Sequence, residues 1–109
     1  VGEYLEYAFK NKSPRITAIF VSNGYMKSKK AWKHNGRIKT LKVYENDLPI
    51  ALLKLKDLRA DQKFEIGTLG RRKDGKDLIL KFEIMEVYTG EKYKDTAITE
   101  IYFDGIDVH

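Results

Sequence analysis

Hydrophobic and polar positions alternate with a period of two along much of the chain. The clearest run covers residues 78–85, where Leu78, Leu80, Phe82 and Ile84 alternate with Ile79, Lys81, Glu83 and Met85. A period of two places successive side chains on opposite faces of a strand, so one face of this segment is expected to be buried.

Six further segments carry strand patterns: residues 5–9, 16–21, 41–44, 50–55, 64–66 and 97–103. Residues 16–21 are apolar on both faces, which predicts a central strand covered on both sides. Turn signals separate the runs, among them Asn23-Gly24, Asp74-Gly75, Thr89-Gly90 and the segment 46–49. About seven short strands with polar turns predict an all-β sandwich or barrel.

Two segments depart from this pattern. In residues 28–34, Ser28 is a good N-cap and Asn35-Gly36 a good stop signal, so we expect one short helical turn in a loop. Residues 67–72 combine glycine with arginine, but no helix pattern follows them, and we expect a basic turn there.

Composition limits the chemistry that the chain can perform. It has 109 residues, no cysteine, two histidines and a net charge of +5. The length suits a single domain, and the lack of cysteine excludes disulfides and thiol catalysis. Glu83 and Glu86 share one predicted strand, where carboxylates are usually solvated. With no enzyme motif and no apolar run of about 20 residues, we expect neither catalysis nor membrane insertion.

The segment from residue 23 to residue 37 is the densest mixture of polar and aromatic residues. The candidate ligand-binding residues are Asn23, Tyr25, Lys27, Trp32, Asn35 and Arg37. Aromatic rings cover the apolar face of a sugar, while amides and charges bond its hydroxyls. Single-stranded nucleic acids use a similar mixture. The structural alternative is that Tyr25 and Trp32 only pin the loop to the sandwich, with Arg37 tying down loop carbonyls.

The order of residues in this loop resembles a known family. Asn23-Gly24-Tyr25-x-Lys27-Ser28, Trp32-x-x-Asn35-x-Arg37-Ile38-Lys39 and the strand after them are similar to the NADase-type glycan-binding domain, a discoidin-like module. The similarity extends over Gly2–Glu6, Leu53-x-Leu55-x-Asp57, 75–88 and 92–105.

The resemblance implies a discoidin-like, galactose-binding-like jelly roll spanning residues 1–109 as one domain. It also implies a non-catalytic, carbohydrate-binding module of an exported bacterial protein, in the periplasm, on the cell surface or secreted. The resemblance also implies a further N-terminal segment, so we expect residues 1–109 to be an N-terminally truncated domain. In related modules that segment helps to hold a structural calcium, of which Glu100 and the Ala97 carbonyl match one half. We therefore expect an incomplete calcium site and no cofactor.

Glycan is the expected partner, and two other functions stay open. A protein-interaction or structural accessory domain would show an exposed apolar patch. A single-stranded nucleic-acid binder would show a coherent basic groove, but the lysines are spread along the whole chain, so we expect no nucleic acid. A missing segment would also leave a sheet edge exposed, which predicts self-association through that edge.

Overall fold

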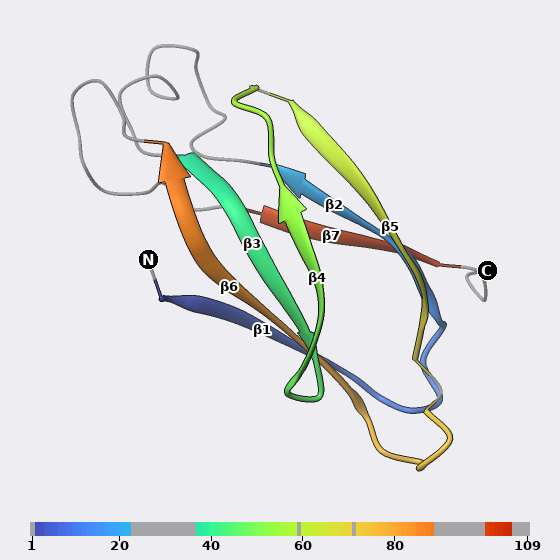
Figure 1. Cartoon of the computed structure of the whole chain (residues 1–109). Coiled ribbons are helices and arrows are strands. Elements are labelled where there is room, and N and C mark those ends of the chain that lie inside the picture. Colours follow the sequence, from blue (N-terminus) through green and yellow to red (C-terminus); the bar gives the residue numbers. More distant parts are fainter. Residues whose placement is uncertain (1, 23–36, 59, 71, 89–99, 106–109) are drawn as a thin grey trace.

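The protein is a β-sandwich in a computed structural model that describes residues 2–22, 37–58, 60–70, 72–88 and 100–105 (Figure 1). Seven strands are described: β1 (Tyr4–Phe9), β2 (Ile16–Ser22), β3 (Arg37–Glu45), β4 (Leu48–Lys54), β5 (Asp61–Leu69), β6 (Leu78–Tyr88) and β7 (Glu100–Gly105). They form a four-stranded sheet in the order β1-β6-β3-β4 and a three-stranded sheet in the order β5-β2-β7. All neighbouring strands are antiparallel, which confirms the predicted all-β sandwich.

The predicted central strand is β2, which lies between β5 and β7. The expected cover on both of its faces is wrong, because its outer face opens into a polar hollow at Thr17 and Ala18. Two other expectations need correction. The turn at residues 46–49 is shorter than expected, because only Asn46 and Asp47 have positive φ values, 46° and 71°, and β4 already begins at Leu48. These two values are those of a tight two-residue hairpin turn, whose backbone twist matches the strands on either side.

The basic turn expected at residues 67–72 is also wrong in its first half. Gly67 to Leu69 belong to β5, and Leu69 still pairs with Ile16 of β2. Gly67 has a φ of 84° and lies where the register between the two strands shifts. A glycine at positive φ allows a strand to bulge and continue, and sequence patterns cannot distinguish this from a turn. The short helix expected at residues 28–34 lies outside the described residues.

The core is made by the inner faces of the two sheets. Its most buried members include Phe82 and Leu80 of β6, Leu41 and Val43 of β3 and Ile19 of β2, all without measurable exposure. Aromatic rings connect the sheets along one side. The Tyr7 ring of β1 meets the Phe82 ring at 5.8 Å and the Phe103 ring of β7 at 5.2 Å, both edge to face.

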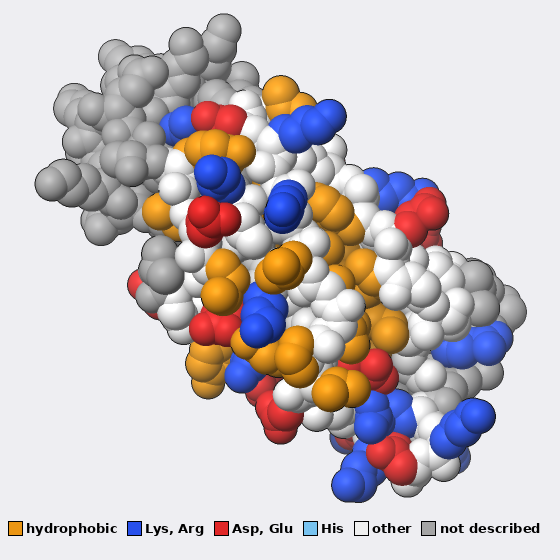
Figure 2. Space-filling model, viewed as in Figure 1, with side chains coloured by type: hydrophobic (Ala, Val, Ile, Leu, Met, Phe, Trp, Pro, Cys, Tyr) orange, Lys and Arg blue, Asp and Glu red, His pale blue; other side chains and the backbone are white. Residues whose placement is uncertain are grey.

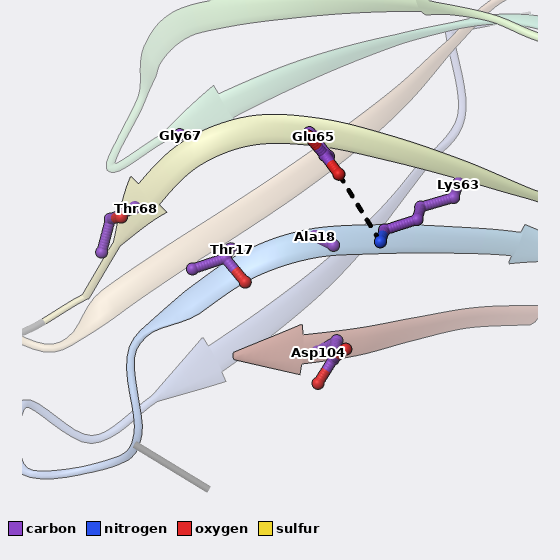
Figure 3. Close-up of a pocket in the computed structure, with 7 residues that line it drawn as sticks. All are labelled: Thr17, Ala18, Lys63, Glu65, Gly67, Thr68 and Asp104. Atoms are coloured by element: carbon purple, nitrogen blue, oxygen red, sulfur yellow. Dashed lines mark ion pairs between the residues drawn. The ribbon is translucent and has the colours of Figure 1, made fainter. Parts of the chain in front are cut away.

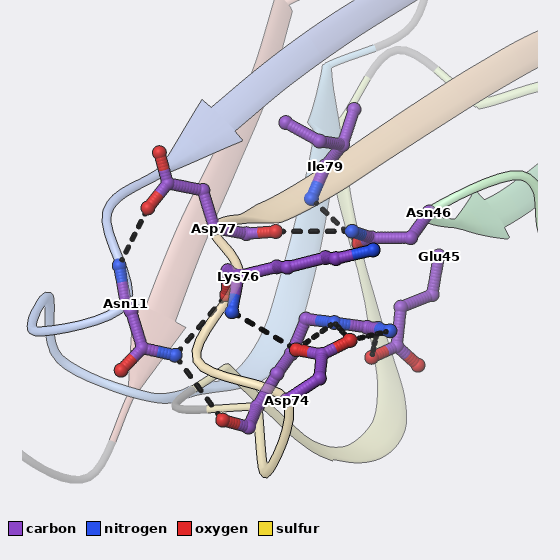
Figure 4. Close-up of polar contacts among 8 residues, drawn as sticks. Asn11, Glu45, Asn46, Asp74, Lys76, Asp77 and Ile79 are labelled. Atoms are coloured by element: carbon purple, nitrogen blue, oxygen red, sulfur yellow. Dashed lines mark hydrogen bonds and ion pairs between the residues drawn. The ribbon is translucent and has the colours of Figure 1, made fainter.

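One end of the sandwich is closed by polar contacts between turns (Figure 4). The Arg72 guanidinium bonds Glu45 at 2.8 Å and Asp74 at 3.0 Å. Asn46 accepts the amide of Ile79 and donates to the carbonyl of Asp77, so the β3–β4 turn is attached to the start of β6. These polar groups bond one another, which favours a structural role for this end of the molecule.

Replacement of Phe82 by alanine is expected to destabilise the fold by about 3–5 kcal/mol, because it removes the ring that meets both sheets and leaves a cavity. Chemical denaturation measures the effect. Leu48→Ala is the control: Leu48 is 65% exposed, and the change is expected to stay within about 0.5 kcal/mol. Similar losses of unfolding free energy in the two variants would show that Phe82 does not lie at the centre of the core.

Acid is expected to loosen the closed end. The hydrogen bond from Arg72, with help from the Lys76 amide, lowers the pKa of Asp74 below its ordinary value of 3.8. Because its pKa is lowered, ionised Asp74 stabilises the fold at pH values above its ordinary pKa. This contribution disappears as the pH falls through the lowered pKa. Urea unfolding between about pH 6 and about pH 2 should therefore depend less on pH in Asp74→Asn than in the parent. An equal pH dependence of unfolding in the variant and the parent would show that Asp74 does not stabilise this end.

Candidate functional site

Three connections between strands begin and end at the other end of the sandwich. β2 ends at Ser22 and β7 begins at its pairing partner Glu100. β3 begins at Arg37 and β6 ends at its pairing partner Tyr88. Each of the connections 22–37 and 88–100 therefore joins one sheet to the other, and the β4–β5 connection lies at the same end. Binding residues of sandwich domains are often carried by such a cluster of connections on a rigid scaffold.

Most of the predicted ligand residues belong to the first of these connections. Asn23, Tyr25, Lys27, Trp32 and Asn35 lie outside the described residues, so their role stays a prediction. Their place in the topology follows from Ser22 and Arg37, which fix the two ends of the connection.

Arg37 is the one described member of the predicted ligand set. Its side chain is 9% exposed, and its Nε and Nη2 atoms donate to the two carboxylate oxygens of Asp57 at 2.7 Å and 2.8 Å. Two parallel bonds of this kind fix both side chains. Asp57 follows β4, so the pair joins the start of β3 to the β4–β5 connection. This geometry supports the alternative in which Arg37 holds the connections in place.

Further polar side chains line this end on the four-stranded sheet. The Thr40 hydroxyl donates to Glu86 at 2.8 Å, and the Tyr88 hydroxyl donates to the carbonyl of Leu55 at 3.1 Å. The Lys39 ammonium lies 5.6 Å from the centre of the Tyr88 ring. Glu86 is exposed, as expected from the sequence, but it is also a bonding partner of a buried threonine.

On the three-stranded sheet, Asp61, Ser22 and Glu100 form a row across β5, β2 and β7. The Ser22 hydroxyl bonds Asp61, and the Tyr102 hydroxyl bonds Glu100. The hydrogen bond to Glu100 and the negative charges nearby raise the pKa of Tyr102. Hydroxyls and carboxylates therefore border this end of the sheet.

Glu100 was expected to form half of a calcium site with the Ala97 carbonyl. Ala97 lies outside the described residues, so the pair cannot be assembled. Across the described part of the chain, no three histidine, cysteine, aspartate or glutamate residues are grouped to hold a metal ion. Calcium takes six to eight oxygen ligands, more than Glu100 and Asp61 supply.

A hollow of about 340 Å³ lies on the outer face of the three-stranded sheet (Figure 3). Ala18 lies between Glu65 of β5 and Asp104 of β7, its pairing partners on either side. Thr17 lies where the register of β2 shifts against both neighbours. Lys63 forms an ion pair with Glu65 at 3.5 Å, in which both side chains are at least half exposed. The hollow is polar and open, and its charges are in contact with solvent.

The outer face of the four-stranded sheet carries tyrosines and lysines from three strands. The Lys81 ammonium lies 5.2 Å from the ring centre of Tyr4 and 4.7 Å from that of Tyr44. Lys42 lies 5.3 Å from the Tyr44 ring, and the Tyr44 hydroxyl donates to Glu83 at 2.7 Å. Figure 2 shows a face on which hydrophobic side chains lie between basic and acidic ones.

This arrangement bears on two of the hypotheses. On this face, Lys42 and Lys81 alternate with Glu6 and Glu83, and Lys54 is paired with Thr40 next to Glu86, so these described lysines do not line a continuous basic groove. Apolar exposure on the same sheet includes Tyr4 at 59% and Leu52 at 56%.

Among the described residues there is no helix that is long and apolar enough to cross a membrane.

Sequence reasoning missed several of these contacts. Asp57 was noted only as part of a family pattern and not as the partner of Arg37. The row at Ser22 and the stacking of Lys81 on two tyrosines depend on strand order. Knowing that β6 pairs with both β1 and β3 would have predicted the stacking of Lys81 on the two tyrosines. Two-residue periodicity, however, does not reveal which strands are neighbours.

The fold and the strand order define a class of protein: an all-antiparallel β-sandwich of a four-stranded and a three-stranded sheet, the architecture of discoidin-like F5/8 type C domains. The chain belongs to the NAD glycohydrolase translocation F5/8 type C domain family, whose model matches residues 1–104. This membership confirms the resemblance found in the sequence. No curated protein and no solved structure gave a significant match.

The clamp between Arg37 and Asp57 provides a test of the scaffold at this end. Arg37→Lys is expected to lose about 1–3 kcal/mol of stability, because lysine cannot make the two parallel bonds. Lys10→Met is the control, since the Lys10–Asp77 pair spans 3.8 Å and the lysine is 87% exposed. Thermal unfolding compares the two, and equal effects would show that the clamp does not stabilise the connections.

Proposed function

We propose that this domain is a non-catalytic carbohydrate-binding module of an exported bacterial protein. The family match is compatible with a binding or accessory module, and the name of the family refers to translocation, which agrees with export. The carbohydrate ligand and the exported location are proposed here in addition to the family match.

The observation that carries the proposal is the position of the aromatic and amide residues in the topology. Tyr25, Trp32 and their neighbours belong to the connection between Ser22 and Arg37, which lie at the end where three connections begin and end. The sandwich holds both ends of this connection, at Ser22 through Asp61 and at Arg37 through Asp57. A fixed scaffold lowers the cost of ordering a binding loop around a weakly bound sugar.

The second candidate function is a protein-interaction or structural accessory domain. It is favoured by the exposed Tyr4 and Leu52 on the outer face of the four-stranded sheet. The two candidates use different parts of the molecule, so variants can separate them.

Trp32→Ala and Tyr25→Ala are each expected to weaken glycan binding by tenfold or more, because a ring stacked on a sugar contributes a large share of such weak affinities. Glycan arrays identify the ligand, and calorimetry with that ligand measures the loss. Tyr4→Ala removes an exposed tyrosine elsewhere and should bind as the parent does.

Three results would count against the proposal. Folded parent protein could fail to bind any array of broad composition, or the loop variants could bind as well as the parent. Equal loss in Tyr4→Ala and Trp32→Ala would show that the effect is not specific to the connection that carries Trp32.

A further inference from the structure

The four edge strands of the sandwich differ in how they are protected against further pairing. The edges are β1 and β4 in one sheet and β5 and β7 in the other. In the pairs β3–β4 and β2–β5 the edge strand carries the extra residues of a register shift, and β4 also carries Pro49. In the pair β2–β7 the extra residue is Thr17 of the central strand, and the edge strand β7 carries the charged residues Glu100 and Asp104. Bulges and prolines of this kind discourage an edge strand from recruiting another strand. Among the described strands, β1 alone pairs with its neighbour in unbroken register.

The sequence of β1 adds no protection of its own. Residues 4–9 contain neither proline nor lysine, and Glu6 is their single charged residue. Its inward residues are Leu5, Tyr7 and Phe9, which are half-buried. Their partners on β6, Phe82, Leu80 and Leu78, are at most 1% exposed. The apolar surface of the sheet is therefore incompletely covered at β1, where one more strand would cover it.

The backbone of β1 offers pairing groups along this edge that no other described strand uses. The Ile84 amide donates to the Glu3 carbonyl at 2.8 Å, so residue 3 directs its backbone groups toward β6. In an antiparallel pair these directions alternate, so Leu5, Tyr7 and Phe9 also face β6. The amides and carbonyls of Tyr4, Glu6 and Ala8 then point away from the sheet.

We propose that β1 pairs with β1 of a second copy of this chain, in antiparallel register about a twofold axis at Tyr7. This places Leu5 opposite Phe9 of the second copy, so that apolar residues meet on the inner side. It places Glu6 opposite Ala8 on the outer side. The two four-stranded sheets become one continuous sheet with both cores on the same side, as a twofold axis perpendicular to the sheet requires.

Charge and length select this register over its neighbours. A twofold axis at Glu6 would bring two carboxylates directly opposite each other, which is destabilising in a cross-strand pair. An axis at Ala8 would pair only residues 7–9 within β1, whereas the axis at Tyr7 pairs residues 5–9. The register about Tyr7 avoids like charges and keeps the longer overlap.

The inner side has room for the second copy. A hollow of about 260 Å³ lies at the end of β1, lined by Phe9, Phe103 and Ile16 among others. The Phe9 and Phe103 rings meet at 5.0 Å and form an apolar wall. Leu5 of the second copy, which lies opposite Phe9 in this register, is placed beside the hollow.

The test uses two variants at the same exposed position. Ala8→Glu faces Glu6 of the second copy and is expected to raise the dimer dissociation constant about tenfold, because the repulsion occurs twice per dimer. Ala8→Lys faces the same carboxylate and is expected to leave the constant unchanged or to lower it. Sedimentation equilibrium of the 109-residue chain from about 5 μM to about 1 mM measures the constants.

Circular dichroism and urea unfolding confirm that both variants are folded, and amide hydrogen exchange gives an independent readout. The amides of Glu6 and Ala8 should exchange more slowly as the concentration of the parent rises. A parent that stays monomeric at about 1 mM would overturn the proposal. So would equal weakening by glutamate and lysine, or a dimer that ignores both changes, since either result requires another register or another surface.

Discussion

The structure depends on the contact between the two sheets around Phe82. This ring lies in the middle of β6, is fully buried, and meets Tyr7 of its own sheet and Phe103 of the opposite sheet. A chain of 109 residues has only one core of this kind, so most of its stability must come from the burial of these inner faces. The turns and connections can vary only as far as they leave this contact intact.

The two ends of the sandwich use polar residues in different ways. At one end, Arg72 donates hydrogen bonds to both Glu45 and Asp74 and holds the turns together. At the other end, the pair Arg37–Asp57 and the row at Ser22 hold the first residues of longer connections. A charged pair that fixes the start of a connection supports whatever that connection binds. This division is why we propose binding at the end where Ser22 and Arg37 lie.

The outer faces of the sheets are more varied than the net charge of +5 indicates. The three-stranded sheet carries Asp61, Glu65, Glu100 and Asp104 beside a single lysine, Lys63. The four-stranded sheet stacks lysines on tyrosines and bonds a tyrosine to a glutamate. Net charge therefore does not describe either face. The edge of β1 differs from both faces, because the groups that it presents are backbone amides and carbonyls.

The sequence by itself determined the class of fold and the positions of the strands. The period-two pattern at residues 78–85 and the run at 16–21, apolar on both faces, depend only on which side chains must leave water. The strands at both places were predicted correctly. It also identified the family, because the residue order of the loop is local information. It failed at Gly67, where a bulge and a turn use the same residue.

The tertiary structure decided which strands are neighbours, and contacts follow from that order. Arg37 was a candidate ligand residue in the sequence, but its guanidinium lies against Asp57, 20 positions away. The Lys81 stack and the unprotected edge of β1 likewise exist only once β6 is placed between β1 and β3. Alternating patterns specify the face on which a side chain lies. They do not specify its cross-strand partner, because pairing is set by long-range packing of the whole sheet.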